Sequence, residues 1–351
     1  MSHSTLEALS AAALFGVSTP LAKILVGEVE PLLLAALLYS GCGLGLAGFK
    51  LLTRPGRPRR SPEARLRKAE LPWLIGAIAA GGVGAPLLLL LGLKGTPAST
   101  ASLLLNFEVV ATALIAVLAF KEAAGREVWL GIALILLGGM VLSLSPAPGG
   151  WGISPGALAI IGACALWGLD NNLTRKISLK DPVSIALAKG FGAGGFALLL
   201  AELLQIRFPS LRVILGALLL GSVSYGLSLV LFVRALRALG AARTGALFGT
   251  APFIGAAASF ALLGEPLTVT FVASLPLMMV GAGLILGERH VHPHAHEALA
   301  HEHRHRHDDG HHLHSHPVEM SPSRSHTHFH LHRPQRHSHP HRPDIHHRHE
   351  H

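Results

Sequence analysis

Charged residues are scarce in this chain of 351 residues, in which only 14% are Asp, Glu, Lys or Arg and 50% are hydrophobic. A soluble domain usually carries about a quarter charged residues, so the composition excludes an ordinary soluble enzyme. Cysteine is also rare. Cys42 and Cys164 both lie in apolar segments, and no disulfide framework is expected. No basic region precedes the first apolar stretch, so a cleaved signal peptide is not predicted.

Histidine is missing from most of the chain: 23 of the 24 histidines lie in residues 290–351, and the other is His3. In residues 290–351 seven arginines balance seven acidic residues, so the net charge of +9 belongs to residues 1–289. There the Lys and Arg residues lie in short connections between apolar stretches. This placement indicates a membrane protein and argues against a nucleic-acid partner.

Ten apolar stretches follow one another before residue 290. A hydrocarbon core of about 30 Å is crossed by roughly 20 apolar residues at 1.5 Å each. We therefore predict an all-α membrane protein with ten transmembrane helices. The expected spans are 5–26, 31–52, 71–93, 97–120, 126–145, 154–175, 183–206, 211–236, 241–263 and 267–287.

The connections between spans differ in charge. Those after even-numbered spans hold 16 Lys and Arg residues, and those on the opposite side hold four, namely Lys23, Lys94, Arg207 and Arg212. By the positive-inside rule, both termini are predicted to be cytoplasmic, in a bacterial inner (plasma) membrane.

An internal repeat divides the spans into two groups of five. Ala-Leu-Phe-Gly at 13–16 matches Ala-Leu-Trp-Gly at 165–168, and a shift of 143 residues superposes Glu122 on Glu265 and Gly138 on Gly281. Five spans are an odd number, so the second copy enters the membrane from the opposite face, as in transporters with inverted repeats. The predicted domains are residues 1–146, residues 147–289 and a tail of residues 290–351.

These features resemble the drug/metabolite transporter superfamily, EamA type, over residues 5–287. They are the five-plus-five arrangement, the Phe/Trp-Gly turns followed by Lys23 or Arg175, and the fourth helix that ends in glutamate. Fourth helices of that family often read Leu-Glu-Pro-Val: residues 107–110 keep the glutamate as Glu108, and residues 250–253 keep the proline as Pro252. The resemblance implies a proton-coupled or exchange-type carrier of small organic solutes, mostly an exporter of metabolites, amino acids or drugs.

Ionisable residues within the spans are the candidates for function, because a charge in the hydrocarbon core is costly and usually faces a cavity or a partner. Glu108 lies near the middle of its span, with Ala101, Ala111 and Thr112 on the same helical face. It is interpreted as a proton acceptor or a contact for a solute amine. Asp170, below Trp167, and Lys189 are expected to line the inner half of the path. The alternatives are a carboxylate–lysine bridge between helices, or snorkelling of Asp170 and Lys189 to the interface.

Several further residues stand at the predicted helix ends. Lys23, Arg175, Glu122 and Glu265 are interpreted as interfacial, as are Trp73 and Trp129, which adjoin cytoplasmic connections.

The tail is histidine-rich and poor in large apolar side chains, so it is predicted to be disordered and without a core. Neutral imidazole binds zinc, nickel and copper, and the tail is a candidate for binding Zn, Ni or Co. A polycation that titrates with pH and mere compositional drift are the alternatives. No cofactor is expected to be required. The candidate metal ligands are His290, His292, His294, His296, His301, His303, His305, His307, His326, His328, His330 and His332.

Three functions are compatible with the sequence. The first is a carrier of organic metabolites, amino acids or drugs, whose partners are the lipid bilayer and a small solute. The second is a divalent transition-metal transporter regulated by the tail, and the third is a membrane-tethered metal buffer or sensor. Because residues 4–289 contain no histidine, the first is favoured over the second. No nucleophile–base or phosphate-loop pattern occurs, so an enzyme is not expected. The oligomeric state is not addressed by the sequence.

Overall fold

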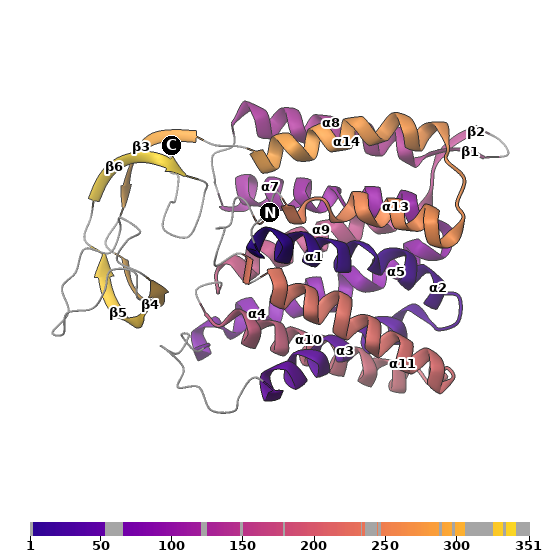
Figure 1. Ribbon diagram of the computed structural model, residues 1–351, viewed down its shortest axis with the longest axis horizontal. Coiled ribbons are helices and arrows are strands. Elements are labelled where there is room, and N and C mark those ends of the chain that lie inside the picture. The colour runs from indigo at the N-terminus through magenta and orange to yellow at the C-terminus, as the bar shows by residue number, and fades with distance from the viewer. Residues whose placement is uncertain are drawn as a thin grey trace.

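The protein is described by a computed structural model, in which the helices run side by side along one axis (Figure 1). The structure describes residues 3–52, 66–120, 125–147, 150–177, 180–232, 234–235, 244 and 247–287, and four segments of the tail, 290–296, 299–305, 326–332 and 335–341. Side chains are described up to residue 285, except at residues 120, 143–153 and 182. Within these limits, the helices form the ten predicted spans.

The first five spans differ from the expected single helices mainly by internal breaks. The first and fourth spans each consist of two helices, and the third passes through a π-helix. The elements are α1 (His3–Gly16), α2 (Ser18–Leu25), α3 (Pro31–Leu52), η1 (Lys68–Glu70), α4 (Leu71–Ala77), η2 (Ile78–Gly84), α5 (Ala85–Gly95), α6 (Ala98–Leu104), α7 (Phe107–Phe120) and α8 (Arg126–Ser143).

The second five spans follow the same plan. The eighth span passes through a π-helix, and in the ninth the helical residues 247–248 are followed by a turn at residues 249–250 and a helix from residue 251. The elements are α9 (Pro155–Arg175), α10 (Pro182–Leu203), α11 (Leu211–Leu220), η3 (Gly221–Leu227), α13 (Ala251–Leu263) and α14 (Val269–Gly287).

The break in the fourth span changes the setting of Glu108. Residues 105–106 form a turn between α6 and α7, where the buried Asn106 donates from Nδ2 to the carbonyl of Leu103 at 2.8 Å. Glu108 therefore stands in the first turn of α7, where the helix dipole favours a carboxylate. The expectation of one continuous face joining Ala101 to Glu108 is wrong, because Ala101 lies on α6.

Packing contacts show that the two groups of five spans are inverted repeats. Gly131 of α8 meets the backbone of Gly281 of α14, where a Cβ on either residue would come within 2.7 to 2.8 Å of the other's carbonyl oxygen. Gly16 packs on α13 at Ala251, and its counterpart Gly168 packs on α7 at Ala111. The π-helices η2 and η3 are likewise 143 residues apart. Each repeat thus presents the same surfaces to the other, as a pseudo-twofold axis requires.

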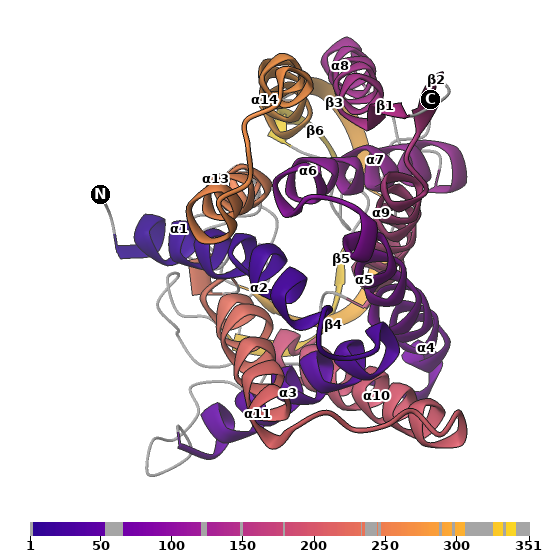
Figure 2. The ribbon, with the colours of Figure 1, turned by 90° about the vertical axis from the view of Figure 1, so that its right-hand side faces the viewer.

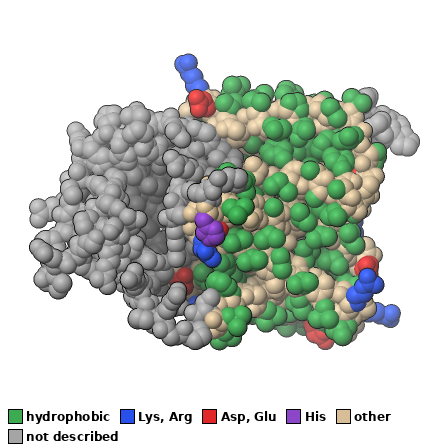
Figure 3. Space-filling view, in the orientation of Figure 1, with side chains coloured by type: hydrophobic (Ala, Val, Ile, Leu, Met, Phe, Trp, Pro, Cys, Tyr) green, Lys and Arg blue, Asp and Glu red, His purple; other side chains and the backbone are tan. Residues whose placement is uncertain are grey.

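The helices leave two distinct ends to the molecule. The proximal end carries the N-terminus of α1 and the tail, and the distal end carries the connections 26–30, 95–97, 204–210 and 264–268 (Figures 1 and 2). On the face seen in Figure 3, hydrophobic side chains cover the middle and charged side chains gather toward the ends. Six of the described helical spans are long and apolar enough to cross a membrane, and the described helices 251–263 and 269–285 are shorter but apolar. The protein is an integral membrane protein.

The described strands lie at the end of the fifth span, in the connection that follows it, and in the tail. β1 (Leu144–Ala147) and β2 (Gly150–Ile153) form an antiparallel hairpin at the distal end. In the tail, β3 (His290–His296) pairs with β6 (Gln335–His341), and β4 (Leu299–His305) pairs with β5 (His326–His332). These four segments differ from the expected disorder, because an alternating sequence has the two-residue period of a strand. The domain boundaries at 146/147 and 289/290 stay predictions.

Candidate functional site

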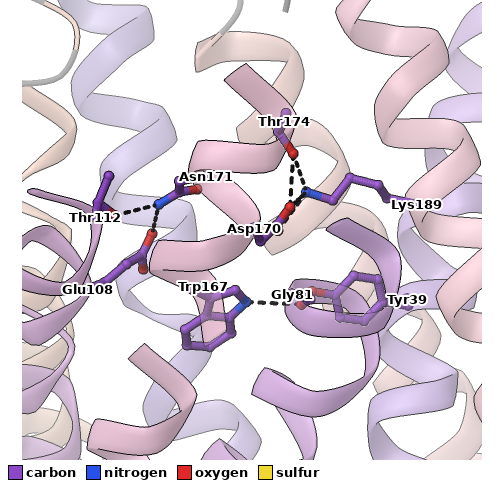
Figure 4. Close-up of polar contacts among 9 residues, drawn as sticks. All are labelled: Tyr39, Gly81, Glu108, Thr112, Trp167, Asp170, Asn171, Thr174 and Lys189. Atoms are coloured by element: carbon purple, nitrogen blue, oxygen red, sulfur yellow. Dashed lines mark hydrogen bonds and ion pairs between the residues drawn. The ribbon is translucent and has the colours of Figure 1, made fainter. Parts of the chain in front are cut away.

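A buried ion pair lies in the interior of the bundle, on the side of α9 that faces α10. Lys189 Nζ of α10 donates to both carboxylate oxygens of Asp170 at 2.6 Å (Figure 4). Thr174, one turn further along α9, donates to Asp170 Oδ1 at 2.8 Å and accepts from Lys189 at 3.3 Å. The Asp170 side chain is 7% exposed, and the Lys189 side chain is 20% exposed. Both charges therefore have partners, as a charge in a membrane interior requires.

A second polar group joins α9 to α7. Asn171 Nδ2 donates to Glu108 Oε1 at 2.9 Å and to Thr112 Oγ1 at 3.1 Å (Figure 4). The buried Asn172 donates to the backbone carbonyls of Thr112 and Gly168, at 3.1 and 2.8 Å. Glu108 is only partly buried and Asn171 is exposed, so this carboxylate is not enclosed by the protein.

Gly81 lies between the ion pair and two aromatic side chains. Its carbonyl oxygen, in the π-helix η2, accepts from Trp167 Nε1 at 3.0 Å and from the Tyr39 hydroxyl at 2.7 Å. A Cβ on Gly81 would lie 1.9 Å from Asp170 Oδ2, so only glycine leaves room for that carboxylate. π-Helices occur often at functional sites, because they change the backbone hydrogen-bond pattern.

The structure brings together all five residues that the sequence singled out, in two neighbouring groups along α9. Asp170, Lys189 and Trp167 lie around Gly81, and Glu108 and Thr112 lie around Asn171. The bridge of Lys189 goes to Asp170, which is the bridge between helices that the sequence left as an alternative. The sequence did not predict the roles of Gly81 and Tyr39. The π-helix that makes the Gly81 carbonyl available has no characteristic sequence pattern.

An aromatic cluster joins α1 to η3. The ring of Phe15 lies 5.7 Å from that of Tyr225 and 5.6 Å from that of Phe248, and Phe248 lies 4.9 Å from Phe232. Tyr39 joins this cluster to Gly81, because its ring lies 5.9 Å from Tyr225. All five side chains are only partly buried. Partly accessible aromatic rings inside a bundle form an apolar surface that a ligand can contact.

The residues at helix ends fall into two classes. Trp73 and Trp129 are 39% and 46% exposed, as expected for interfacial side chains. Lys23 and Glu265 instead bind backbone groups of another span: Lys23 donates to the carbonyls of Leu93 and Thr96, and Glu265 accepts from the amides of Ala98 and Ser99. The interfacial interpretation is therefore too simple for these two. Arg175 ends α9, and Glu122 lies outside the described residues.

The histidines of the tail are brought into register by the strand pairs. His290, His292 and His294 stand opposite His341, His339 and His337. His301, His303 and His305 stand opposite His330, His328 and His326. His296 and His332 stand opposite Gln335 and Leu299, and His307 lies outside the described residues. Metal binding by these residues stays a prediction. Among the described side chains of the spans, no group of three or more His, Cys, Asp or Glu residues could hold a metal ion.

Comparison with known proteins matches residues 5–144 and 154–287, in two copies, to the EamA-like transporter family. An uncharacterized transporter of Methanothermobacter thermautotrophicus is 30% identical over 292 residues, which are 79% of this chain and 84% of that protein. The uncharacterized protein PA1977 of Pseudomonas aeruginosa is 32% identical over 194 residues, 55% of this chain and 66% of that protein. One crystal structure superposes with a TM-score of 0.55 at 19% identity, covering 81% of this chain and 95% of its own, and so shares the fold.

Proposed function

Because the chain belongs to the EamA-like transporter family, and is thus a membrane transporter and not an enzyme, we propose that it is a secondary active exporter of small organic solutes. The solutes it carries are metabolites, amino acids or drugs that combine an ionisable group with an apolar body. Transport is coupled to protons or to exchange.

The observation that carries this proposal is the polar cluster on α9. Asp170 and Asn171 are neighbours in sequence, and they bind Lys189 of α10 and Glu108 of α7. Carboxylates and an ammonium group inside a membrane bundle are typical of solute and proton pathways. The donors are oxygen and nitrogen groups without imidazole or thiolate, which suits an organic solute better than a transition metal.

Within this proposal the two carboxylates have different roles. The Glu108 carboxylate accepts from the neutral amide of Asn171 and is partly exposed, so it can exchange a proton with water or accept a solute amine. Asp170 is already neutralised by Lys189, and a charged group of the solute competes for this pair. The aromatic cluster of Phe15, Tyr39, Tyr225, Phe232 and Phe248 then contacts the apolar body of the solute.

The proposed orientation places both termini in the cytoplasm of a bacterial cell, with the distal end outside. It rests on the 16-to-4 distribution of Lys and Arg between the two sets of connections. Single cysteines at Gly149 and Gly56 test it. An impermeant thiol reagent should label the first in intact cells and the second only after the membrane is opened, and the reverse pattern would invert the topology.

Transport itself is tested with the purified protein in proteoliposomes. A pH gradient should drive the flux of amino acids or amines that carry an aromatic or aliphatic body, and a saturating second solute should compete. Zinc or nickel flux under the same conditions is the alternative outcome. Robust metal flux without flux of any organic solute would reverse the order of the two functions.

The tail has a separate proposed role, which is to bind divalent transition metals without taking part in the solute path. The specific observation is the register that places six histidines of each strand pair opposite one another. Residues directly opposite in an antiparallel pair have Cβ atoms about 5 Å apart, and residues two apart share a face. Two adjacent pairs thus supply the four ligands that zinc prefers.

Deleting residues 290–351 tests this role. The truncated protein should lose nickel and zinc binding in equilibrium dialysis and retain organic-solute flux. Because ligation needs neutral imidazole, binding by the full chain should weaken as the pH falls below about 6.5. Metal binding that survives truncation would place the site in the membrane part.

A further inference from the structure

We propose that Glu265 and Lys23 form a clamp that holds the distal end of the protein closed, and that breaking this clamp opens the transport path on that side. The assignment adds two residues to the proposed function: it concerns which end of the path is open and does not depend on the identity of the solute. Four observations support it.

The first observation is the way in which Glu265 ties one repeat to the other. Its carboxylate oxygens accept from the backbone amides of Ala98 at 2.6 Å and Ser99 at 2.9 Å, at the start of α6. Glu265 belongs to the second repeat and α6 to the first. Gly264 ends α13 in the left-handed conformation at φ 63°, which glycine adopts without strain. This turn directs the chain back toward α6.

The second observation is the complementary contact of Lys23. Its ammonium group, at the end of α2, donates to the carbonyls of Leu93, Lys94 and Thr96, where α5 ends. A cation thus binds the C-terminus of α5 while an anion binds the N-terminus of α6, each with the sign that the helix dipole favours. The connection 95–97 is held at both sides by opposite charges.

The third observation is that the closed distal end contains buried hydroxyl groups that lack a hydrogen-bond partner in the described part of the chain, which is unfavourable in free energy. The hydroxyls of Thr96 and Ser102 are buried without a hydrogen-bond partner among the described residues. A buried hydroxyl without a partner is unfavourable. The Ser102 hydroxyl faces Gly255 of α13, so water would satisfy it if α6 moved away from α13, whereas the Thr96 hydroxyl lies against Gly156 of α9. The clamp therefore stabilises a closed contact that the buried Ser102 hydroxyl destabilises.

The fourth observation is that small residues make close contacts below the clamp. Ser102 of α6 faces Gly255 of α13, where a Cβ would lie 2.8 Å from the serine oxygen, and Gly16 packs on the next part of α13 at Ala251. Such a surface closes tightly but offers little apolar area to hold it together. At this end the Glu265 carboxylate bonds the second repeat to the first, and Lys23 holds the same connection from within the first repeat.

Cysteine accessibility tests the clamp without any knowledge of the solute. Cys42 and Cys164 are first replaced by alanine, and Ser102→Cys is introduced as the reporter. Its labelling by an impermeant maleimide is followed in intact cells and in inverted vesicles, so that the topology is read from the same experiment. As a positive control, the protein is thermally denatured and then labelled, which shows that the reporter thiol reacts once it is exposed.

Glu265→Gln and Lys23→Met are the two test variants, because each keeps the shape and removes the charge. Losing charge-assisted hydrogen bonds should raise the rate of labelling from the distal side at least about tenfold. The matched control is Glu30→Gln, which breaks the exposed pair of Glu30 and Lys94 at the same end but within one repeat. Its labelling rate should stay within about twofold of the parent rate.

The result that would overturn the proposal is an unchanged labelling rate in both test variants, provided that each is monodisperse and folded. An equal rise in Glu30→Gln would also overturn it, because the effect would then follow from charge loss at the surface. A rise in the two test variants, combined with no flux of any organic solute, would retain the clamp and reject the proposed substrate class.

Discussion

The interior of the bundle has two halves that share a backbone and differ in chemistry. The polar half contains Asp170, Lys189 and Glu108, and the equivalent positions of the aromatic half hold Ser18, Leu38 and Ala251. Trp167 corresponds in the same way to Phe15. The duplication therefore supplied two copies of one helix arrangement, and substitution gave the charges to one copy of the surface and the aromatic cluster to the other. A solute with one polar and one apolar end would be held in a defined orientation across such a pair.

The largest effect is expected from breaking the ion pair of the polar half. Lys189→Met leaves the carboxylate of Asp170 buried without its cation, and this should lower the free energy of unfolding by about 3 to 5 kcal/mol. Adding Asp170→Asn should restore most of that stability, because the uncompensated charge is gone, but not transport. Thermal unfolding in detergent and solute flux in proteoliposomes separate the two effects.

The matched change in the aromatic half is Ser18→Ala, at the position equivalent to Asp170. It should cost no more than about 1 kcal/mol, as is usual for loss of one neutral hydroxyl. Equal losses of stability in Lys189→Met and Ser18→Ala would show that the two halves do not differ electrostatically.

The next largest effect on transport is expected at Glu108, whose equivalent position in the aromatic half is Ala251. Glu108→Gln keeps the hydrogen-bonding shape toward Asn171 but cannot exchange a proton. Flux driven by a pH gradient should be abolished, while exchange of solute for solute and the amount of folded protein are retained. Unchanged gradient-driven flux would leave Glu108 with a structural role only.

Gly81→Ala tests whether transport requires the close contact between Gly81 of η2 and the Asp170 carboxylate. The added methyl group would overlap Asp170 Oδ2, so the ion pair must shift, and flux should fall at least about tenfold. Gly195→Ala in α10 is the control, because a methyl group there would meet no neighbouring atom within 4 Å among the described residues. That variant should be neutral or more stable by up to about 1 kcal/mol. Equal flux in the two variants would contradict the assigned role of Gly81.

The smallest effect is expected in the aromatic half. Phe248→Leu removes the ring contacts with Phe15 and Phe232 but keeps an apolar side chain. Since one aromatic pair contributes about 0.5 to 1.5 kcal/mol, the KM for solutes with an aromatic body should rise about two- to tenfold. Solutes with a small body should be unaffected, and competition flux with matched solutes measures the difference. A uniform change for all solutes would remove the proposed role of this half.

Much of this arrangement could be predicted from the sequence, because the signals are strong and local. Runs of about 20 apolar residues define the spans. The duplicated Gly and Glu positions define the two inverted repeats, which the family match confirms. The carboxylates and Lys189 are conspicuous within apolar segments, and the structure brings Lys189 to Asp170 and Glu108 to Asn171, two neighbouring residues of α9.

The features that the sequence left hidden depend on backbone geometry or on distant contacts. The turn at residues 105–106 interrupts a helical segment, and no proline or glycine marks it. The carbonyl of Gly81 is available because η2 is a π-helix, and the ring contacts of Tyr39 and Tyr225 join residues far apart in the chain. In the sequence, Lys23 and Glu265 stand at helix ends like ordinary interfacial residues. Only the fold places the connection 95–97 between them.

The two π-helices also record the order of events in the history of the chain. Inserting one residue into an α-helix creates a π-turn and rotates everything beyond it by roughly 100°. η2 and η3 occupy the same seven positions of their repeats, 143 residues apart. A single insertion in an ancestor with five helices accounts for both π-helices. Separate insertions would have to occur independently at the same position of each repeat. The irregular turn is therefore older than the duplication, and the ancestral half-protein already carried it when two copies first paired.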